Sequence, residues 1–190
     1  MYSYGDEDHG YATYSYVLVG RDEFNQDAIS LYLKLISAIQ GSTVEVLSLP
    51  NNVRAANFNL FLIPAIGKKG DVSPEPNYEL SKLLLTALSA SSPENFDSPG
   101  PYIITLYRPI SFRKQDDLAD ILYIDLTNLH PTAIPEVVST YKRKILEENI
   151  SGIDKLRSIR LSILNTLLIT EDSIGFARAA YAELRSAFFK

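Results

Sequence analysis

Hydrophobic residues between positions 14 and 40 change from a short continuous run to a helical repeat. Residues 14–20 (YSYVLVG) are mostly aromatic or β-branched, which is typical of a buried strand. Further on, apolar side chains recur at steps of four and three residues, at Phe24, Ala28, Leu31, Leu35 and Ala38. This spacing places them on one side of a helix that can cover a sheet. The pattern therefore predicts the first half of a β-α-β unit.

The rest of the chain continues this alternation and then becomes helical. Apolar runs predict four further strands, at residues 43–49, 57–64, 102–107 and 121–126. Helical spacing predicts one helix after Asn77, a good N-cap, and three more helices from Thr132 onward. We therefore predict a single layered α/β domain over residues 13–190, with about five mainly parallel strands and a helical C-terminal part at 132–190. The strand order is left open.

Residues 1–12 have a different composition and predict a flexible, exposed N-terminal arm. The arm is acidic and contains tyrosine and glycine, with Asp6, Glu7, Asp8 and His9 in succession. A docking or metal-binding tail is the functional alternative to a frayed terminus. Carboxylates on a flexible arm would bind a cation weakly, because ordering the arm costs entropy.

Composition excludes several classes of protein and of site but does not identify a function. The chain has 190 residues, of which 46% are hydrophobic and 22% charged, as in an ordinary globular domain. Its net charge of −5 argues against a general nucleic-acid binder. The absence of cysteine excludes disulfides, thiolate catalysis, zinc ribbons and iron–sulfur clusters within this chain. With only two histidines, a site of several imidazoles is excluded too, and we expect no metal and no cofactor.

Targeting signals leave the compartment open. No apolar run reaches the roughly 18–20 residues of a transmembrane helix. The polar start lacks the basic and apolar regions of a signal peptide, but it is compatible with a native leader replaced at Met1. The expected localisation is cytoplasmic, or periplasmic or secreted if such a leader existed.

Basic and polar residues follow several of the predicted strands. In parallel sheets, ligands bind where the loops at the carboxyl ends of the strands converge. That rule selects six candidates for binding a phosphate or a carboxylate: Arg21, Lys68, Lys69, Arg108, Asp125 and His130. The alternative is that the cations among them are solvated, as most loop charges are.

Two of these candidates have further interpretations. Asp125 interrupts an apolar strand: it needs a partner such as Arg108 or Arg113 if it points into the core, and it is solvated if it faces a loop end. His130 is the one weak catalytic candidate, as a general base. The alternative for His130 is an ordinary turn at the Asn-Leu-His-Pro sequence.

Established catalytic motifs are missing. Residues 67–70 (GKKG) do not match the spacing of a phosphate-binding loop, and residues 20–22 lack the dinucleotide fingerprint. No Gly-x-Ser-x-Gly nucleophile elbow occurs. Asp22 is better explained as a helix N-cap.

Three functional hypotheses follow, in order of preference. The first is a non-catalytic binding or protein-interaction domain, in one version an exported accessory protein, with a protein partner or a small anionic ligand. The second is a small enzyme that acts on an anionic substrate at the carboxyl ends of the strands, with His130 as base. The third is a self-associating scaffold, a homodimer formed through residues 152–190.

Overall fold

The computed structural model describes residues 1–20, 26–41, 58–68, 75–90, 96–112 and 121–147. Within them, a four-stranded mixed sheet has the order β2-β1-β5-β6. Its strands are β1 (Thr13–Leu18), β2 (Asn59–Leu62), β5 (Tyr102–Leu106) and β6 (Leu122–Asp125). A small second sheet pairs β3 (Ala65–Ile66) with β4 (Glu75–Pro76). The helices are α1 (Gln26–Gly41), α2 (Tyr78–Ala90) and α3 (Ile134–Glu147), with short 3-10 helices η3 (Ile110–Phe112) and η4 (Pro131–Ala133).

The directions of the strands differ from the prediction of a mainly parallel sheet. β1 and β2 are parallel, with Tyr14 opposite Leu60. β5 runs antiparallel to β1, and β6 runs antiparallel to β5. A continuous apolar strand indicates burial on both faces, and an antiparallel strand meets that condition equally well when helices cover both sides. The sequence pattern therefore located the strands but not their directions.

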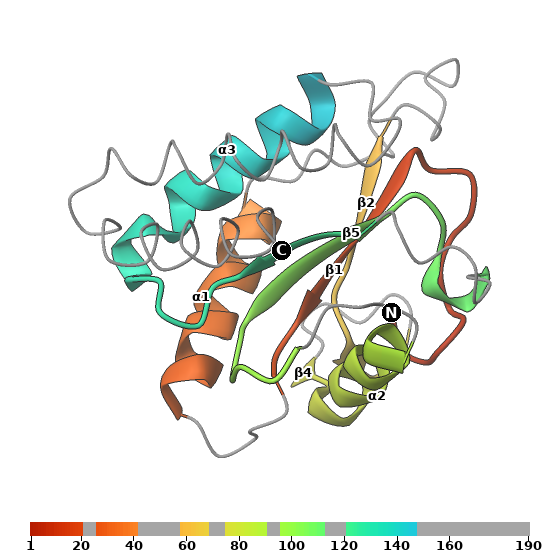
Figure 1. Cartoon of the computed structure of the whole chain (residues 1–190), viewed down its shortest axis with the longest axis horizontal. Coiled ribbons are helices and arrows are strands. Elements are labelled where there is room, and N and C mark those ends of the chain that lie inside the picture. The colour runs from red at the N-terminus through yellow and green to blue at the C-terminus, as the bar shows by residue number, and fades with distance from the viewer. Residues whose placement is uncertain (21–25, 42–57, 69–74, 91–95, 113–120, 148–190) are drawn as a thin grey trace, which may run out of the picture.

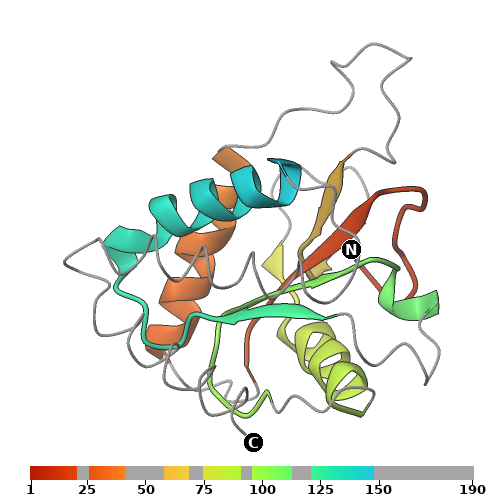
Figure 2. The same cartoon turned by 45° about the horizontal axis from the view of Figure 1, so that its top comes forward.

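Helices cover the two faces of the sheet, as Figures 1 and 2 show: α1 and α3 lie on one side and α2 lies on the other. Alternate residues of β1 explain this arrangement, because Val17 belongs to the core under α1 and α3 whereas Tyr16 and Leu18 belong to the core under α2. The architecture is thus a helix–sheet–helix sandwich of α+β type.

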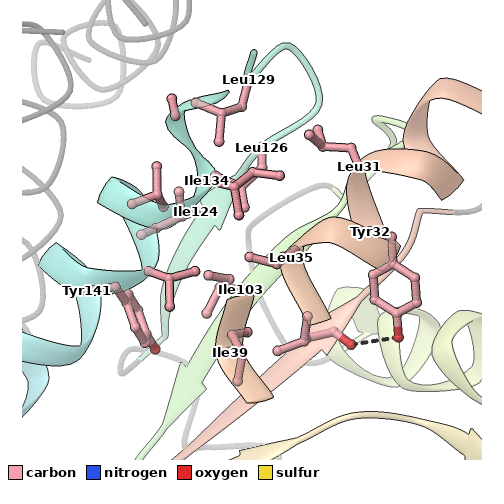
Figure 3. Close-up of a cluster of buried hydrophobic side chains, with 14 of the residues drawn as sticks. Leu31, Tyr32, Leu35, Ile39, Ile103, Ile124, Leu126, Leu129, Ile134 and Tyr141 are labelled. Atoms are coloured by element: carbon pink, nitrogen blue, oxygen red, sulfur yellow. Dashed lines mark hydrogen bonds between the residues drawn. The ribbon is translucent and has the colours of Figure 1, made fainter. Parts of the chain in front are cut away.

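The core between the sheet and the helices α1 and α3 is apolar and closely packed. Figure 3 shows Leu31, Leu35 and Ile39 of α1 facing the side chains of the sheet and of α3. The hydroxyl of Tyr32 donates a 3.2 Å hydrogen bond to the carbonyl oxygen of Val17, which ties α1 to β1. The repeat that predicted the helix therefore corresponds to its buried face.

The predicted helix signals are confirmed where the structure describes them. The Oδ1 atom of Asn77 accepts a 2.9 Å hydrogen bond from the backbone N–H of Leu80, which makes Asn77 the cap of α2. α1 ends at Gly41, and Asp22, the cap predicted for its start, lies outside the described residues. The predicted strand at 43–49, the helices beyond Glu147 and the homodimer segment 152–190 lie outside the described residues.

Candidate functional site

The strand directions divide the predicted site residues between opposite ends of the sheet. Asp125 lies opposite Tyr102, at the start of β5, whereas Arg108 follows the far end of the same strand. His130 follows β6, on the side of Asp125. The predicted convergence of loops therefore fails for Arg108, because it assumed that β5 was parallel to its neighbours.

Of the other three predicted cations, the structure describes only Lys68. Lys68 is exposed and follows the short strand β3. Arg21 and Lys69 lie outside the described residues. Of the six candidates, the structure places only Asp125 and His130 at the same end of the sheet on neighbouring parts of the chain.

Asp125 acts as an internal cap at the end of β6. Its Oδ1 atom accepts hydrogen bonds from the backbone N–H of Thr127, at 2.9 Å, and from the Thr127 hydroxyl. The Thr127 hydroxyl oxygen in turn accepts a 3.0 Å bond from the N–H of Gly100. The carboxylate therefore holds the chain after β6 against the loop before β5, as in an Asx turn. The partner of Asp125 is thus Thr127 and not Arg108, which follows the other end of β5, and Arg113, the second suggested partner, lies outside the described residues.

His130 also has a structural role. Its side chain caps η4, with Nδ1 2.8 Å from the hydroxyl of Thr132 and 3.5 Å from the Thr132 backbone nitrogen. The ring is exposed. The alternative interpretation, a turn residue before proline, accounts for these contacts.

The loop before β5 closes over the carboxyl end of β1. The N–H of Gly20 donates a 2.7 Å hydrogen bond to the carbonyl oxygen of Pro99. Phe96, at the start of this part of the loop, is fully buried, with its ring edge-on to those of Tyr102 and Tyr123. The carboxyl end of β1, where the rule for parallel sheets predicts a crevice for a ligand, is therefore covered by a packed backbone segment.

A network of buried hydroxyls joins the sheet to α3, and the sequence analysis did not identify it. Ser15 and Thr105 are cross-strand partners, and their hydroxyl oxygens lie 2.9 Å apart. The hydroxyl of Tyr141 lies 2.7 Å from that of Ser15 and also bonds to Thr105. Burial raises the pKa of Tyr141 to about 12, although both hydroxyl bonds act in the opposite direction. All three side chains are fully buried, so the network joins elements and does not face solvent.

The polar residues within the otherwise apolar strands β1 and β5 are the sequence feature from which this network could have been predicted. Asn59 extends it, because its Oδ1 atom accepts hydrogen bonds from the hydroxyls of Thr13 (2.8 Å) and Ser15 (2.7 Å). Buried polar groups are normally hydrogen-bonded, so a serine and a threonine at facing positions indicate such a pair. Their pairing needs the register of β1 against β5.

A second cluster, the Glu7 clasp, holds the N-terminal arm against the sheet; it consists of Glu7, Tyr16, Ile110 and Ser111. Glu7 is only 4% exposed, in contrast to the exposed position expected for the arm, whereas Asp8 and His9 are exposed as expected. One carboxylate oxygen accepts a 3.0 Å bond from the hydroxyl of Tyr16 and the other a 2.9 Å bond from that of Ser111. The flexibility of the arm itself stays a prediction.

Next to the clasp, side chains of the arm and of η3 form an exposed aromatic surface, which we call the arm surface: Tyr4, His9 and Phe112. Tyr4 is 47% and Phe112 57% exposed. The rings of His9 and Phe112 are tilted, with centroids 4.8 Å apart. The Tyr4 hydroxyl lies 3.5 Å from the carbonyl oxygen of Ile110. Figures 1 and 2 show the arm, in red, passing beside the green turn of η3.

The described residues contain neither a candidate metal site nor a helix that could span a membrane. No group of three or more histidine or acidic side chains there could hold a metal ion. Among the helices of the described segments, none has the length and apolar character to cross a membrane. The chain matches no known family model, and it shows no significant similarity to curated proteins or to solved structures.

Proposed function

We propose that this chain is a non-catalytic protein-interaction domain, and that it binds a basic segment of a protein partner at the arm surface. The observation that carries the proposal is the exposure of Tyr4 and Phe112 on a surface that is hydrogen-bonded to the body of the protein. Large aromatic side chains are enriched at the centres of protein interfaces. Because the arm is already anchored, less entropy is lost when a partner binds.

The structural roles of two predicted site residues, the binding candidate Asp125 and the weak catalytic candidate His130, favour this proposal over an enzyme. Asp125 and His130 serve as caps of a turn and of a short helix. The Oδ1 atom of Asp125 and the Nδ1 atom of His130 are therefore engaged in local contacts that fix the path of the chain. Of the cations predicted to hold an anionic substrate, Arg108 lies at the opposite end of the sheet from His130.

Charge and ring chemistry indicate the kind of partner. Asp6 and Asp8 are exposed residues of the same arm as Tyr4 and His9, in a chain whose net charge is −5. A lysine or arginine side chain can lie on an aromatic face while a carboxylate nearby attracts its charge. Arg108 is exposed in the segment between β5 and η3 and carries a positive charge, so Arg108→Gln tests the sign of the electrostatic contribution to binding.

The test measures binding of fluorescein-labelled hexa-arginine by fluorescence anisotropy near physiological salt. We expect saturable binding to the full chain, weakened about 2- to 5-fold by Phe112→Ala or Tyr4→Ala, as the loss of one exposed cation–π contact implies. Arg108→Gln should strengthen binding. Leu83→Ala removes a side chain of similar exposure (52%) on α2 and should leave the affinity for the peptide unchanged.

Two outcomes would contradict the proposal. One is equal affinity of the Phe112, Tyr4 and Leu83 variants for the peptide, since the attraction would then be non-specific. The other is binding of hexa-glutamate as tight as that of hexa-arginine.

A further inference from the structure

Backbone hydrogen bonds attach the N-terminal arm to the body of the protein at both of its ends. At its start, the α-amino group of Met1 donates a 2.9 Å hydrogen bond to the carbonyl oxygen of Ile63, and the N–H of Ala65 donates to the carbonyl oxygen of Met1 at 3.0 Å. At its end, the N–H of Ala12 donates to the carbonyl oxygen of Phe58 at 3.0 Å. The two ends of the arm thus lie at the two ends of β2, and the residues between them form a loop whose ends are held by backbone bonds.

The Glu7 clasp attaches the arm between these two ends, and it differs from them in chemistry. Glu7 is the only charged residue among the buried residues of the described chain. Both of its donors, Tyr16 and Ser111, are neutral hydroxyls. Burial, the larger influence, and the neighbouring carboxylate raise the pKa of Tyr16, so its proton stays available to donate.

The donors of the clasp are themselves fixed. The Tyr16 side chain projects from the middle of β1, and its oxygen accepts a 2.8 Å bond from the N–H of Ile110 at the start of η3. Glu7, β1 and η3 therefore meet at one hydroxyl group. A buried carboxylate costs free energy unless its hydrogen bonds are complete, so loss of either donor shifts the balance toward solvation of Glu7 and release of the arm.

Release of the arm would dismantle the arm surface. Tyr4 and His9 belong to the arm, on either side of Glu7, whereas Phe112 belongs to η3. The contact between the His9 and Phe112 rings exists only while the arm is docked. We propose that the Glu7 clasp is a conformational latch: with Glu7 bound, the two halves of the arm surface are held together, and without it they separate while the core stays folded.

The latch concerns the assembly of the arm surface and does not depend on what binds there. Only a role for the latch in controlling the binding of a partner rests on the proposed function. The first test is amide hydrogen exchange of the full chain, comparing Glu7→Ala and Glu7→Gln with Asp8→Asn. Asp8→Asn removes the same charge from the exposed neighbouring residue, so it is the matched control.

We expect Glu7→Ala to accelerate exchange in residues 1–12 at least about tenfold, with β1 and β5 unchanged. Glu7→Gln should have a smaller effect, because an amide oxygen still accepts one of the two bonds. Asp8→Asn should accelerate exchange far less than Glu7→Ala, because Asp8 is exposed. The His9 ring protons, measured by NMR, should lose the shift caused by the Phe112 ring in Glu7→Ala but not in Asp8→Asn.

Several results would overturn the latch. Equal exchange of the arm in Glu7→Ala and Asp8→Asn would mean that Glu7 does not hold it. Acceleration in β1 and β5 as large as that in the arm would make Glu7 a residue of the global fold. If Glu7→Ala does not fold, Ser111→Ala supplies the test, since it removes one donor at a half-buried position; it must accelerate exchange in residues 1–12 selectively. Failure of hexa-arginine to bind would leave these exchange results intact, which separates the latch from the proposed function.

Discussion

Gly20 marks a crossing of two backbone segments at the end of β1. A Cβ atom placed there would lie 2.2 Å from the carbonyl oxygen of Ser98 and 2.3 Å from the carbonyl carbon and oxygen of Pro99. These neighbours are backbone atoms, which cannot move aside as the end of a long side chain can. The residue therefore has to be glycine for reasons of space, and the loop that covers β1 depends on it.

We expect Gly20→Ala to lower the free energy of unfolding by about 1–3 kcal/mol or more, as overpacking of a buried site does. Urea unfolding followed by circular dichroism measures it. Gly41→Ala is the control, because a Cβ atom at Gly41 meets nothing within 4 Å at the end of α1. That control should be neutral, or stabilising by less than about 1 kcal/mol. Equal stability of the two variants would contradict the close crossing.

At the scale of elements, α3 is attached to its neighbours by polar contacts as well as by the apolar core. Tyr141 reaches the buried hydroxyls of Ser15 and Thr105 on the sheet. The next residue, Lys142, donates a 2.9 Å hydrogen bond to the carbonyl oxygen of Ile39 in the last turn of α1 and lies 5.3 Å from the centre of the Phe61 ring. Carbonyl groups at the end of a helix lack partners within it, so the lysine satisfies one of them.

Tyr141→Phe should lower the free energy of unfolding by about 1 kcal/mol, because it removes one hydroxyl from the network and keeps the ring in the core. Thermal or urea unfolding measures the difference. The loss should stay moderate, since Ser15 and Thr105 still bond to each other. An unchanged free energy of unfolding would mean that the hydroxyls of Ser15 and Thr105 keep their full set of hydrogen bonds without the tyrosine.

At the scale of the whole molecule, buried tyrosines dominate the response to alkaline pH. Burial raises the pKa of Tyr16, Tyr32 and Tyr102 well above the ordinary value, and that of Tyr141 to about 12. In the unfolded chain these groups lose their protons near pH 10. The folded state therefore retains protons that the unfolded state has lost, and stability falls as the pH rises above about 10.

We expect a flat free energy of unfolding between about pH 8 and 9.5, followed by a decrease of up to about 1.4 kcal/mol per pH unit for each tyrosine. Burial lowers the pKa of Lys142, which opposes this trend with one partly exposed group. Urea unfolding at a series of pH values measures the slope. Tyr141→Phe should reduce the slope between pH 10 and 12, and an unchanged slope in that variant would contradict the assignment.

The sequence by itself determined the elements that depend on local patterns. The run at residues 14–20 and the repeat after it correspond to β1 and α1, and Asn77 caps α2 as its side chain and position indicated. These features could be predicted because burial on a helix face or a strand face leaves a period in the sequence, and a cap is a contact between residues three apart.

Only the tertiary structure decided which elements are antiparallel and which polar side chains meet. The direction of β5 places Arg108 away from Asp125. Glu7 can be buried because Tyr16 and Ser111, which are 9 and 104 residues further along the chain, donate hydrogen bonds to its carboxylate. The pairing of Ser15 with Thr105 likewise needs a strand register. Such contacts leave no period in the sequence, because they depend on the path of the connections and on long-range packing, whereas the strand and the helix are encoded within a few turns of the chain.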